Sequence, residues 1–198
     1  MNNNKNIPSI PFYFIRHGQT DWNLQGLRQG HSDIPLDQTG IEQARAVAPL
    51  FSGLGITRII ASPLRRARKT ADVINEKLNV PIAMHEGLKE CSWGVLEGTP
   101  KDTTVLFSDW CQGTACIEGG ETAQEFKMRI VDVLCEVLDP NEVTLIVSHG
   151  GVYWAIMELL GFKQQHIANC EPHFFNPSLV EKQSLWAVDS VDNIHKQQ

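Results

Sequence analysis

Short apolar runs and segments of helical spacing alternate along this chain. Runs of apolar, β-branched and aromatic residues predict buried strands at Ile10–Ile15, Thr57–Ser62 and Val143–Val147. A late strand is predicted over Ser184–Val188. Between these runs, apolar residues recur at intervals of three and four, which predicts helices with one buried face. The helical stripes cover residues 41–51, 64–78, 126–137 and 152–160.

Helix boundaries are predicted from capping residues. T-x-x-E boxes at Thr39–Glu42 and Thr122–Glu125 are typical of helix starts, because their side chains can pair with free backbone N–H groups. Ser62 is predicted as the N-cap of another helix, with Pro63 at its first position. Pro49 falls inside the first stripe, so we expect that helix to kink or end there.

The strand–helix alternation predicts an α/β fold with a mainly parallel central sheet and helices on both faces. No repeat or linker divides the chain, so a single domain is predicted over residues 10–198, after a flexible polar tail at residues 1–9. Ligands of such sheets bind beyond the carboxyl ends of the strands. The residues that end the strands are therefore the first candidates for a functional site.

Charge and cysteine content narrow the partners and the compartment. The 198 residues carry a formal net charge of -6, so we expect neither nucleic acid nor a membrane surface as a general partner. The polar N-terminus does not resemble a signal peptide, and no apolar run is long enough to span a bilayer. Five cysteines without C-x-x-C spacing favour a reducing compartment, and we expect a cytoplasmic protein.

Unusual residues stand at three predicted strand ends. The first strand ends in Arg16-His17-Gly18, where we expect the glycine to let the backbone turn sharply. The second leads into a basic run at residues 65–69, in which Arg66 lies off the apolar stripe and is the candidate for the site. We expect the other cations of this run to point into solvent. The third is followed by His149, Gly150 and a second glycine, whose open backbone N–H groups suit an anion.

Arginines and histidines at one rim favour phosphoryl chemistry. Guanidinium groups offer paired N–H donors to phosphate oxygens. Neutral imidazole can attack phosphorus, and nearby guanidinium groups keep the ring neutral because they disfavour a further positive charge. A leaving alkoxide needs a proton, for which Glu90 and Glu97 are candidates.

Six segments with these residues occur in a recognisable order: RHGQTDWN, QG…PLDQTGIEQA, SPLRRARKTA, LKECSWGVLEG, GGET and VSHGG. The ordered set, roughly from Ile10 to Leu160, resembles the phosphoglycerate mutase-like branch of the histidine phosphatase superfamily. The resemblance implies the three-layer sandwich of that branch, with no metal and no other cofactor. Gln19 stands where many members have glutamate, and Thr122 where many have serine.

The resemblance also implies a role for each matching residue. His17 is similar to the phosphorylated nucleophile of the family. Glu90 is similar to its proton donor, which later acts as the base that activates water, and Glu97 is similar to a structural residue. The residues implied to surround the phosphoryl group are Arg16, Asn23, Arg66 and His149.

The same pocket can pass the phosphoryl group to water or to a second hydroxyl. Mutases of the family carry a long basic insertion after the Glu90 motif, whereas residues 98–120 here contain one basic residue, Lys101, and three acidic ones. We therefore predict a phosphatase of a small phosphomonoester, with phosphoglycerate mutase as the alternative. We interpret the aromatic residues of this region as the core of a lid; if they face the site, they suit a substrate with an uncharged or aromatic body. These residues are Phe107 and Trp110, together with the nearby Trp93.

Three other classes of protein are alternatives to the predicted histidine phosphatase. A cysteine phosphatase needs C-x5-R, which none of the five cysteines provides. A metallohydrolase could use His17 and His149, and would lose its activity in chelator. A domain that only binds a phospholigand would lack the nucleophile or the acid. The oligomeric state stays open, with a homodimer among the candidates.

Overall fold

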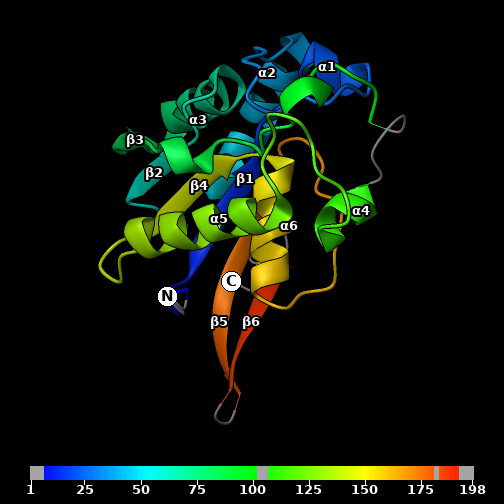
Figure 1. Cartoon of the computed structure of the whole chain (residues 1–198). Coiled ribbons are helices and arrows are strands. Elements are labelled where there is room, and N and C mark those ends of the chain that lie inside the picture. Colours follow the sequence, from blue (N-terminus) through cyan, green and yellow to red (C-terminus); the bar gives the residue numbers. More distant parts are fainter. Residues whose placement is uncertain (1–6, 102–106, 181–182, 192–198) are drawn as a thin grey trace.

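A six-stranded sheet forms the centre of the fold, with strand order β3-β2-β4-β1-β5-β6 (Figure 1). The computed structural model describes residues 7–101, 107–180 and 183–191. The predicted strands are confirmed, and β3 and β5 are additions that the pattern did not predict. The strands are β1 (Phe12–Arg16), β2 (Arg58–Ala61), β3 (Ile82–Met84), β4 (Thr144–Ser148), β5 (Pro172–Val180) and β6 (Gln183–Ser190).

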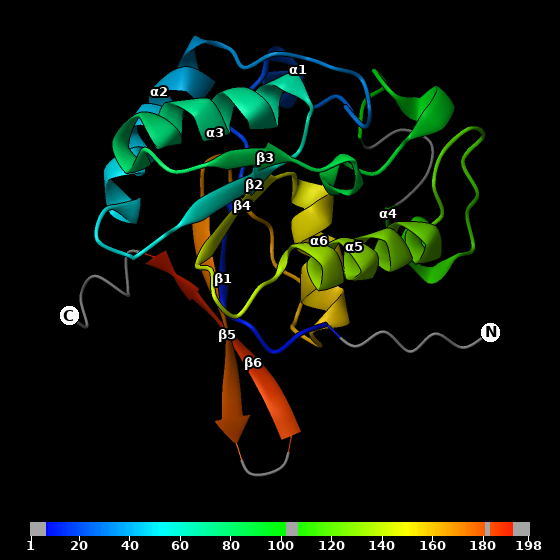
Figure 2. The ribbon, with the colours of Figure 1, turned by 90° about the vertical axis from the view of Figure 1, so that its left-hand side faces the viewer.

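The sheet is mainly parallel, as predicted. Strand β4 pairs in parallel with β1 on one side and with β2 on the other, and β2 pairs in parallel with β3. Strands β5 and β6 form an antiparallel hairpin that joins the sheet through β1. This hairpin extends away from the helices in both Figure 1 and Figure 2.

Helices cover both faces of the sheet, as predicted. Helices α2 and α3 lie on one side, and α5 and α6 lie on the other (Figure 2). A short α4 lies beside α5 and α6, and a four-residue α1 follows β1 (Figure 1). Their bounds are α1 (Asp21–Leu24), α2 (Gln38–Val47), α3 (Arg65–Leu78), α4 (Phe107–Gln112), α5 (Ala123–Val137) and α6 (Gly150–Leu159). Three short 3-10 turns are η1 (Ala48–Phe51), η2 (Glu86–Leu88) and η3 (Gly94–Leu96).

Alternate residues of the central strands supply two separate cores. In β1, Phe12 and Phe14 belong to the core beneath α5 and α6, whereas Tyr13 and Ile15 belong to the core beneath α2 and α3. This follows from the two-residue period of a strand, whose side chains point to opposite faces. Because both faces are buried, the strand is apolar at every one of these positions, which is the pattern that made it predictable.

Two of the predicted helix starts are corrected. Helix α2 begins at Gln38, and the carboxylate of Asp37 accepts a hydrogen bond from the Gly40 N–H, so Thr39 lies inside the helix. Helix α3 begins at Arg65 with Leu64 at its N-cap, and Ser62 lies too far upstream to cap it. In both cases the tertiary path of the preceding loop decides where helical geometry begins.

The other boundary predictions are confirmed. Thr122 and Glu125 form the reciprocal capping box of α5. The α-helical geometry of α2 gives way to the 3-10 turn η1 where Pro49 stands. Residues 1–6 of the predicted tail lie outside the described part of the chain, and Ile7 packs against the core beneath α5 and α6.

Candidate active site

Three parallel strands bring the unusual strand-end residues together. Arg16, at the end of β1, is in register with Ser148, at the end of β4, and the His17 N–H donates to the Ser148 carbonyl at 2.8 Å. The Ser62 N–H, after β2, donates to the Val147 carbonyl at 3.0 Å. The rings of His17 and His149 consequently lie edge to face with centroids 5.1 Å apart.

His17 is held as a neutral ring with one nitrogen available. Its side chain is buried, and its Nδ1 lies 2.7 Å from the Gly18 carbonyl. A carbonyl oxygen only accepts hydrogen bonds, so Nδ1 carries the proton and Nε2 keeps its lone pair. Burial, and then the Arg66 and Arg16 guanidinium groups, lower the pKa of His17 well below 6.5. The ring is therefore uncharged at neutral pH, and the lone pair on Nε2 can act as a nucleophile.

Gly18 is required for a reason other than the sharp turn predicted from the sequence. Its φ is not positive, so it needs no left-handed conformation. Instead, a Cβ at this position would lie 2.4 Å from the carbonyl oxygen of Gly40 at the start of α2. The two glycines let α2 pack against the loop that follows β1, next to His17.

Arg16 and Arg66 are buried cations held by carbonyl groups. Arg16 donates to the Ile167 carbonyl at 2.8 Å, and Arg66 donates to the carbonyls of Ser32 and Gly30, both at 2.8 Å. In the part of the chain that the structure describes, neither forms an ion pair, and the Nε of each has no hydrogen-bond partner. Burial lowers the pKa of Arg66 to about 10, so it remains charged at neutral pH. Two buried, unpaired guanidinium groups are costly unless an anion binds between them.

His149 lies next to His17 and, like Arg16 and Arg66, has one buried nitrogen atom without a hydrogen-bond partner among the described residues. It is fully buried, its Nε2 is 2.7 Å from the Ser62 hydroxyl, and its Nδ1 has no partner among the described residues. Burial, and then Arg66, lower the pKa of His149 well below 6.5. Ser62 thus orients a site residue, which is the role that replaces the helix cap predicted for it.

Glu90 is seated at the N-terminus of α6. One carboxylate oxygen accepts from the Gly151 N–H at 3.0 Å, and the other accepts from the Cys91 N–H at 2.9 Å. A Cβ on residue 151 would lie 2.1 Å from Glu90 Oε1, so the second glycine of the VSHGG motif makes room for this carboxylate. The motif therefore positions an acid as well as exposing N–H groups.

A partly buried ion pair that the sequence pattern did not predict anchors the Glu90 segment. Arg129 of α5 donates to both carboxylate oxygens of Glu121 at 2.8 and 2.7 Å. The same guanidinium donates to the carbonyls of Gly87, Lys89 and Glu90 at 2.7, 2.9 and 3.3 Å. This explains the glutamate of the GGET segment, because it holds the arginine that holds the Glu90 backbone. Bidentate pairs of this kind are geometrically specific.

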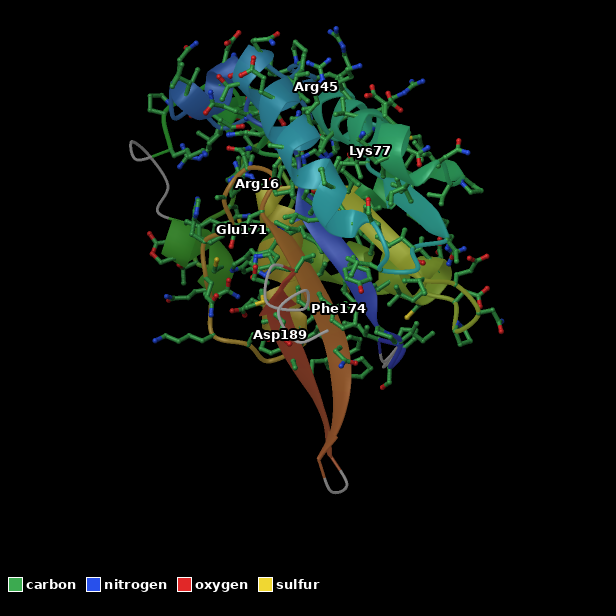
Figure 3. All side chains as sticks on the ribbon, turned by 180° about the vertical axis from the view of Figure 1, so that it is seen from behind. Arg16, Arg45, Lys77, Glu171, Phe174 and Asp189 are labelled. Atoms are coloured by element: carbon green, nitrogen blue, oxygen red, sulfur yellow. The ribbon has the colours of Figure 1, made fainter. Side chains whose placement is uncertain are left out.

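Asn23 and Gly150 also line the cavity beside these groups. Asn23 lies on α1, and its Oδ1 accepts from the Asn169 side chain at 3.3 Å. Asn169 also donates to the His17 carbonyl at 2.8 Å, so one amide ties the loop before β5 to two site residues. Nothing in the sequence pattern singled out Asn169. Figure 3 shows the same loop from behind, with Glu171 just below Arg16.

Residues expected to lie outside the site do so. The side chains of Arg65, Arg68 and Lys69 are exposed, in contrast to the fully buried Arg66. Glu97 is structural, because its carboxylate accepts from the backbone N–H groups of His31 and Ser32 at 2.8 and 2.7 Å. Other cations of α2 and α3, such as Arg45 and Lys77, lie on the outer side of these helices (Figure 3).

A cavity of about 620 Å³ opens over these groups. It is lined at one end by Arg16, His17, Asn23, Arg66, Glu90 and Gly150. Trp93 and Phe107 also line it, which favours the alternative that these two face the site, whereas Trp110 is buried behind them. Further lining residues that the sequence did not reveal are Leu27, Arg28, Gln29, Trp154, Glu158, Gln164, Gln165, His166 and Ile167. Lys101, the lone cation of residues 98–120, lines the cavity as well.

The described part of the chain offers neither a metal-binding cluster nor a membrane-spanning helix. Within residues 7–101, 107–180 and 183–191, no group of three or more His, Cys, Asp or Glu side chains is arranged to hold a metal ion. Among the helices that the structure describes, none is both long enough and apolar enough to cross a bilayer.

The fold and the strand-end cluster define a phosphoryl-binding α/β protein, and comparison with known proteins specifies the family. The profile of the histidine phosphatase superfamily (branch 1) matches residues 12–181. The chain therefore belongs to the histidine phosphatase superfamily.

Individual relatives carry names from both sides of the phosphatase and mutase division. The chain is 38% identical over 146 residues to Uncharacterized phosphatase PhoE of Bacillus subtilis (strain 168), covering 72% of this chain and 73% of that protein. It is 39% identical over 150 residues to Probable phosphoglycerate mutase GpmB of Escherichia coli (strain K12 / DH10B), covering 71% and 70%. The solved structure of mycobacterial glucosyl-3-phosphoglycerate phosphatase superimposes with a TM-score of 0.77 at 24% identity, over 91% of this chain and 97% of that one. At that identity, the likeness shows the shared fold.

Proposed function

We propose that this protein is a metal-independent phosphatase that hydrolyses a small phosphomonoester through a phosphohistidine formed on His17. The observation that carries the proposal is the set of buried, unpartnered nitrogen atoms around that ring: the Nε atoms of Arg16 and Arg66 and the Nδ1 of His149. A phosphate dianion offers negative charge and several acceptor oxygens at once. It would therefore satisfy a cluster that is unfavourable without an anion.

In the first step, the Nε2 lone pair of His17 attacks phosphorus. The P–N bond forms as the P–O bond to the substrate alcohol breaks, and Glu90 donates a proton to the departing oxygen. The phosphorylated ring retains its Nδ1 proton and gains positive charge. The Gly18 carbonyl, 2.7 Å from Nδ1, stabilises that charge. The two guanidinium groups stabilise the charge on the transferred phosphoryl group.

In the second step, Glu90 acts as a carboxylate base. It takes a proton from a water molecule, the oxygen of that water attacks phosphorus, and the P–N bond breaks. His17 returns to its neutral form and inorganic phosphate leaves. The hydrogen bonds from Gly151 and Cys91 keep the carboxylate in one place for both proton transfers.

Release of phosphate from 4-nitrophenyl phosphate in excess chelator tests this proposal, with wild type and His17→Ala compared. We expect rapid release by the wild type and a loss of roughly 10³-fold or more in the variant. Mass spectrometry after an alkaline, denaturing quench, in which the P–N bond is stable, should find one phosphoryl group on the peptide that contains His17. Equal release by the two proteins would rule out His17 as the nucleophile, and dependence on added metal would favour a metallohydrolase.

A phosphoglycerate mutase is the second candidate, favoured by the name of one relative and by the cation Lys101 at the cavity. A mutase would return the phosphoryl group to a second hydroxyl rather than to water. Incubation of 3-phosphoglycerate with and without 2,3-bisphosphoglycerate separates the two. Isomerisation faster than phosphate release would show a mutase, and phosphate release alone would show a phosphatase.

The proposal extends to the setting of the enzyme. We infer a cytoplasmic enzyme, supported by Cys91, Cys111, Cys116 and Cys170, which are free thiols. We also infer that its partner is a phosphorylated small molecule rather than nucleic acid, and a homodimer remains a prediction. Size-exclusion chromatography with light scattering measures the oligomeric state directly.

A further inference from the structure

The cavity runs along one face of α6, away from the phosphoryl site. Gly150, Gly151, Trp154 and Glu158 all line it, and the last three follow one another at helical intervals on the same face. A helix rises 1.5 Å per residue, so the cavity extends for about 12 Å from Gly150 to Glu158. A phosphate bound at His17 would occupy only the first part of that length. The remainder is available to the body of the substrate.

Aromatic rings form the wall of this second part. Phe107 of α4 contacts Trp154 of α6 with ring centroids 5.5 Å apart, and its centroid is 6.3 Å from that of Trp93. All three side chains line the cavity. Phe107 is nevertheless 47% exposed, although it is a large apolar residue packed on other aromatic rings. Exposed aromatic surface inside a cavity is typical of a ligand-binding wall.

The described lining residues that follow Trp154 in the chain are mainly polar and include no lysine or arginine. The Gln164 amide donates to the Glu158 carboxylate at 2.7 Å, and Gln165 lies next to it on the rim. These groups can form hydrogen bonds with the edge of a ring. The Glu158 carboxylate would repel a second anionic group bound beside it.

We propose that this aromatic wall selects phosphomonoesters whose alcohol carries a flat, uncharged aromatic ring two or three bonds from the ester oxygen. The spacing follows from α6, because Trp154 lies three residues beyond Gly151, roughly 5 Å along the helix axis. A ring at that distance would lie against Trp154 and Phe107 while the phosphoryl group lies against His17. This inference rests on the proposed phosphatase function and specifies its substrate class.

Two esters with the same type of leaving group test the inference: 2-(1-naphthyl)ethyl phosphate and ethyl phosphate. Both release a primary alcohol, so a difference in kcat/KM reports the ring and not the chemistry. We expect kcat/KM to be about tenfold or more higher for the naphthyl ester, as for burial of one aromatic ring. Phe107→Ala should reduce that preference about fivefold, and Phe107→Leu, which keeps the bulk but not the ring, should reduce it less.

Met128→Ala is the matched control, because Met128 is an apolar residue of α5 that is 53% exposed and does not line the cavity. It should leave the preference unchanged.

Equal kcat/KM for the two esters, or an equal loss for both in Phe107→Ala, would overturn the inference and leave the phosphatase proposal intact. If the wild type hydrolyses neither ester, the phosphatase proposal fails. Titration calorimetry then decides the inference separately, since the naphthyl ester should still bind at least tenfold more tightly than ethyl phosphate.

Discussion

The two ends of the cavity are built on different principles. At the phosphoryl end, Arg16, His17 and His149 stand at the ends of paired strands, are buried, and are held by backbone carbonyls or a neighbouring hydroxyl. At the other end, Phe107 and Gln164 come from a short helix and a loop and are exposed to solvent. Side chains at strand ends are placed precisely because the hydrogen bonds between strands fix their backbone. Loops, in contrast, can change in sequence and conformation without disturbing the sheet. One end is suited to a common chemical step and the other to substrate choice.

If this division is correct, changes at the phosphoryl end should slow all substrates, and changes at the aromatic end should alter the ratio between them. Glu90→Gln should produce the largest effect short of removing His17. We expect a loss of roughly 10²- to 10⁴-fold in kcat for ethyl phosphate, because an alkoxide leaves poorly without a proton. With 4-nitrophenyl phosphate, whose leaving group needs no acid, stopped-flow absorbance should show a burst of one nitrophenolate per enzyme before slow turnover. Absence of the burst would show that Glu90 is not the base that activates water in the second step.

Arg66→Met should produce the next largest effect. Loss of this guanidinium should lower kcat/KM by roughly 10²- to 10³-fold for both naphthyl and ethyl esters, as for removal of one preorganised donor. Inorganic phosphate at about 100 times its Kd should stabilise the wild type by about 2.7 kcal/mol, and this stabilisation should vanish in the variant. Thermal unfolding with and without phosphate measures it. If phosphate still stabilised the Arg66→Met variant against thermal unfolding, the anion would bind at a site that does not include Arg66.

Arg129→Ala tests whether the Glu90 segment needs its anchor. Loss of the guanidinium leaves the Glu121 carboxylate and three carbonyls without their donor, so we expect a lower kcat, by roughly tenfold to a hundredfold, for ethyl phosphate. The effect should be much smaller for 4-nitrophenyl phosphate, since positioning of an acid matters less when the leaving group is good. Arg129→Lys should restore little, because lysine cannot form the bidentate pair. A uniform loss with both esters would indicate general destabilisation instead.

The smallest effect concerns stability and pH in the absence of phosphate. Burial lowers the pKa of His17, His149 and His173 in the folded state, so the unfolded chain binds protons first as the pH falls. Their contribution to stability is present above pH 6.5 and is lost as the pH drops below it. Each histidine should add at most about 1.4 kcal/mol per pH unit to the decrease in the free energy of unfolding as the pH falls. Urea unfolding of wild type and His149→Asn between about pH 7.5 and pH 5.5 should show the shallower slope in the variant. Parallel slopes would contradict the neutral, buried state of His149.

The parts of the fold that could be predicted are those in which local pattern and tertiary role coincide. β1 and β4 are apolar on both faces because helices cover both, so a continuous apolar run identifies them. β5 was missed because two prolines, Pro172 and Pro177, interrupt the usual strand pattern, and such residues are tolerated only where no ladder hydrogen bond is lost. β3 is a three-residue edge strand, too short for any periodicity to show.

The sequence by itself determined the chemistry of the phosphoryl end. His17, Arg66 and His149 could be proposed because each lies within a few residues of a predictable strand end, and parallel strands bring such ends to one edge. Tertiary structure alone decided what surrounds them. The anchor of Glu90 through Arg129, the amide bridge of Asn169 and the pairing of Phe107 with Trp154 join residues from separate elements. No local periodicity encodes those contacts, because they depend on how helices and loops pack once the sheet has formed.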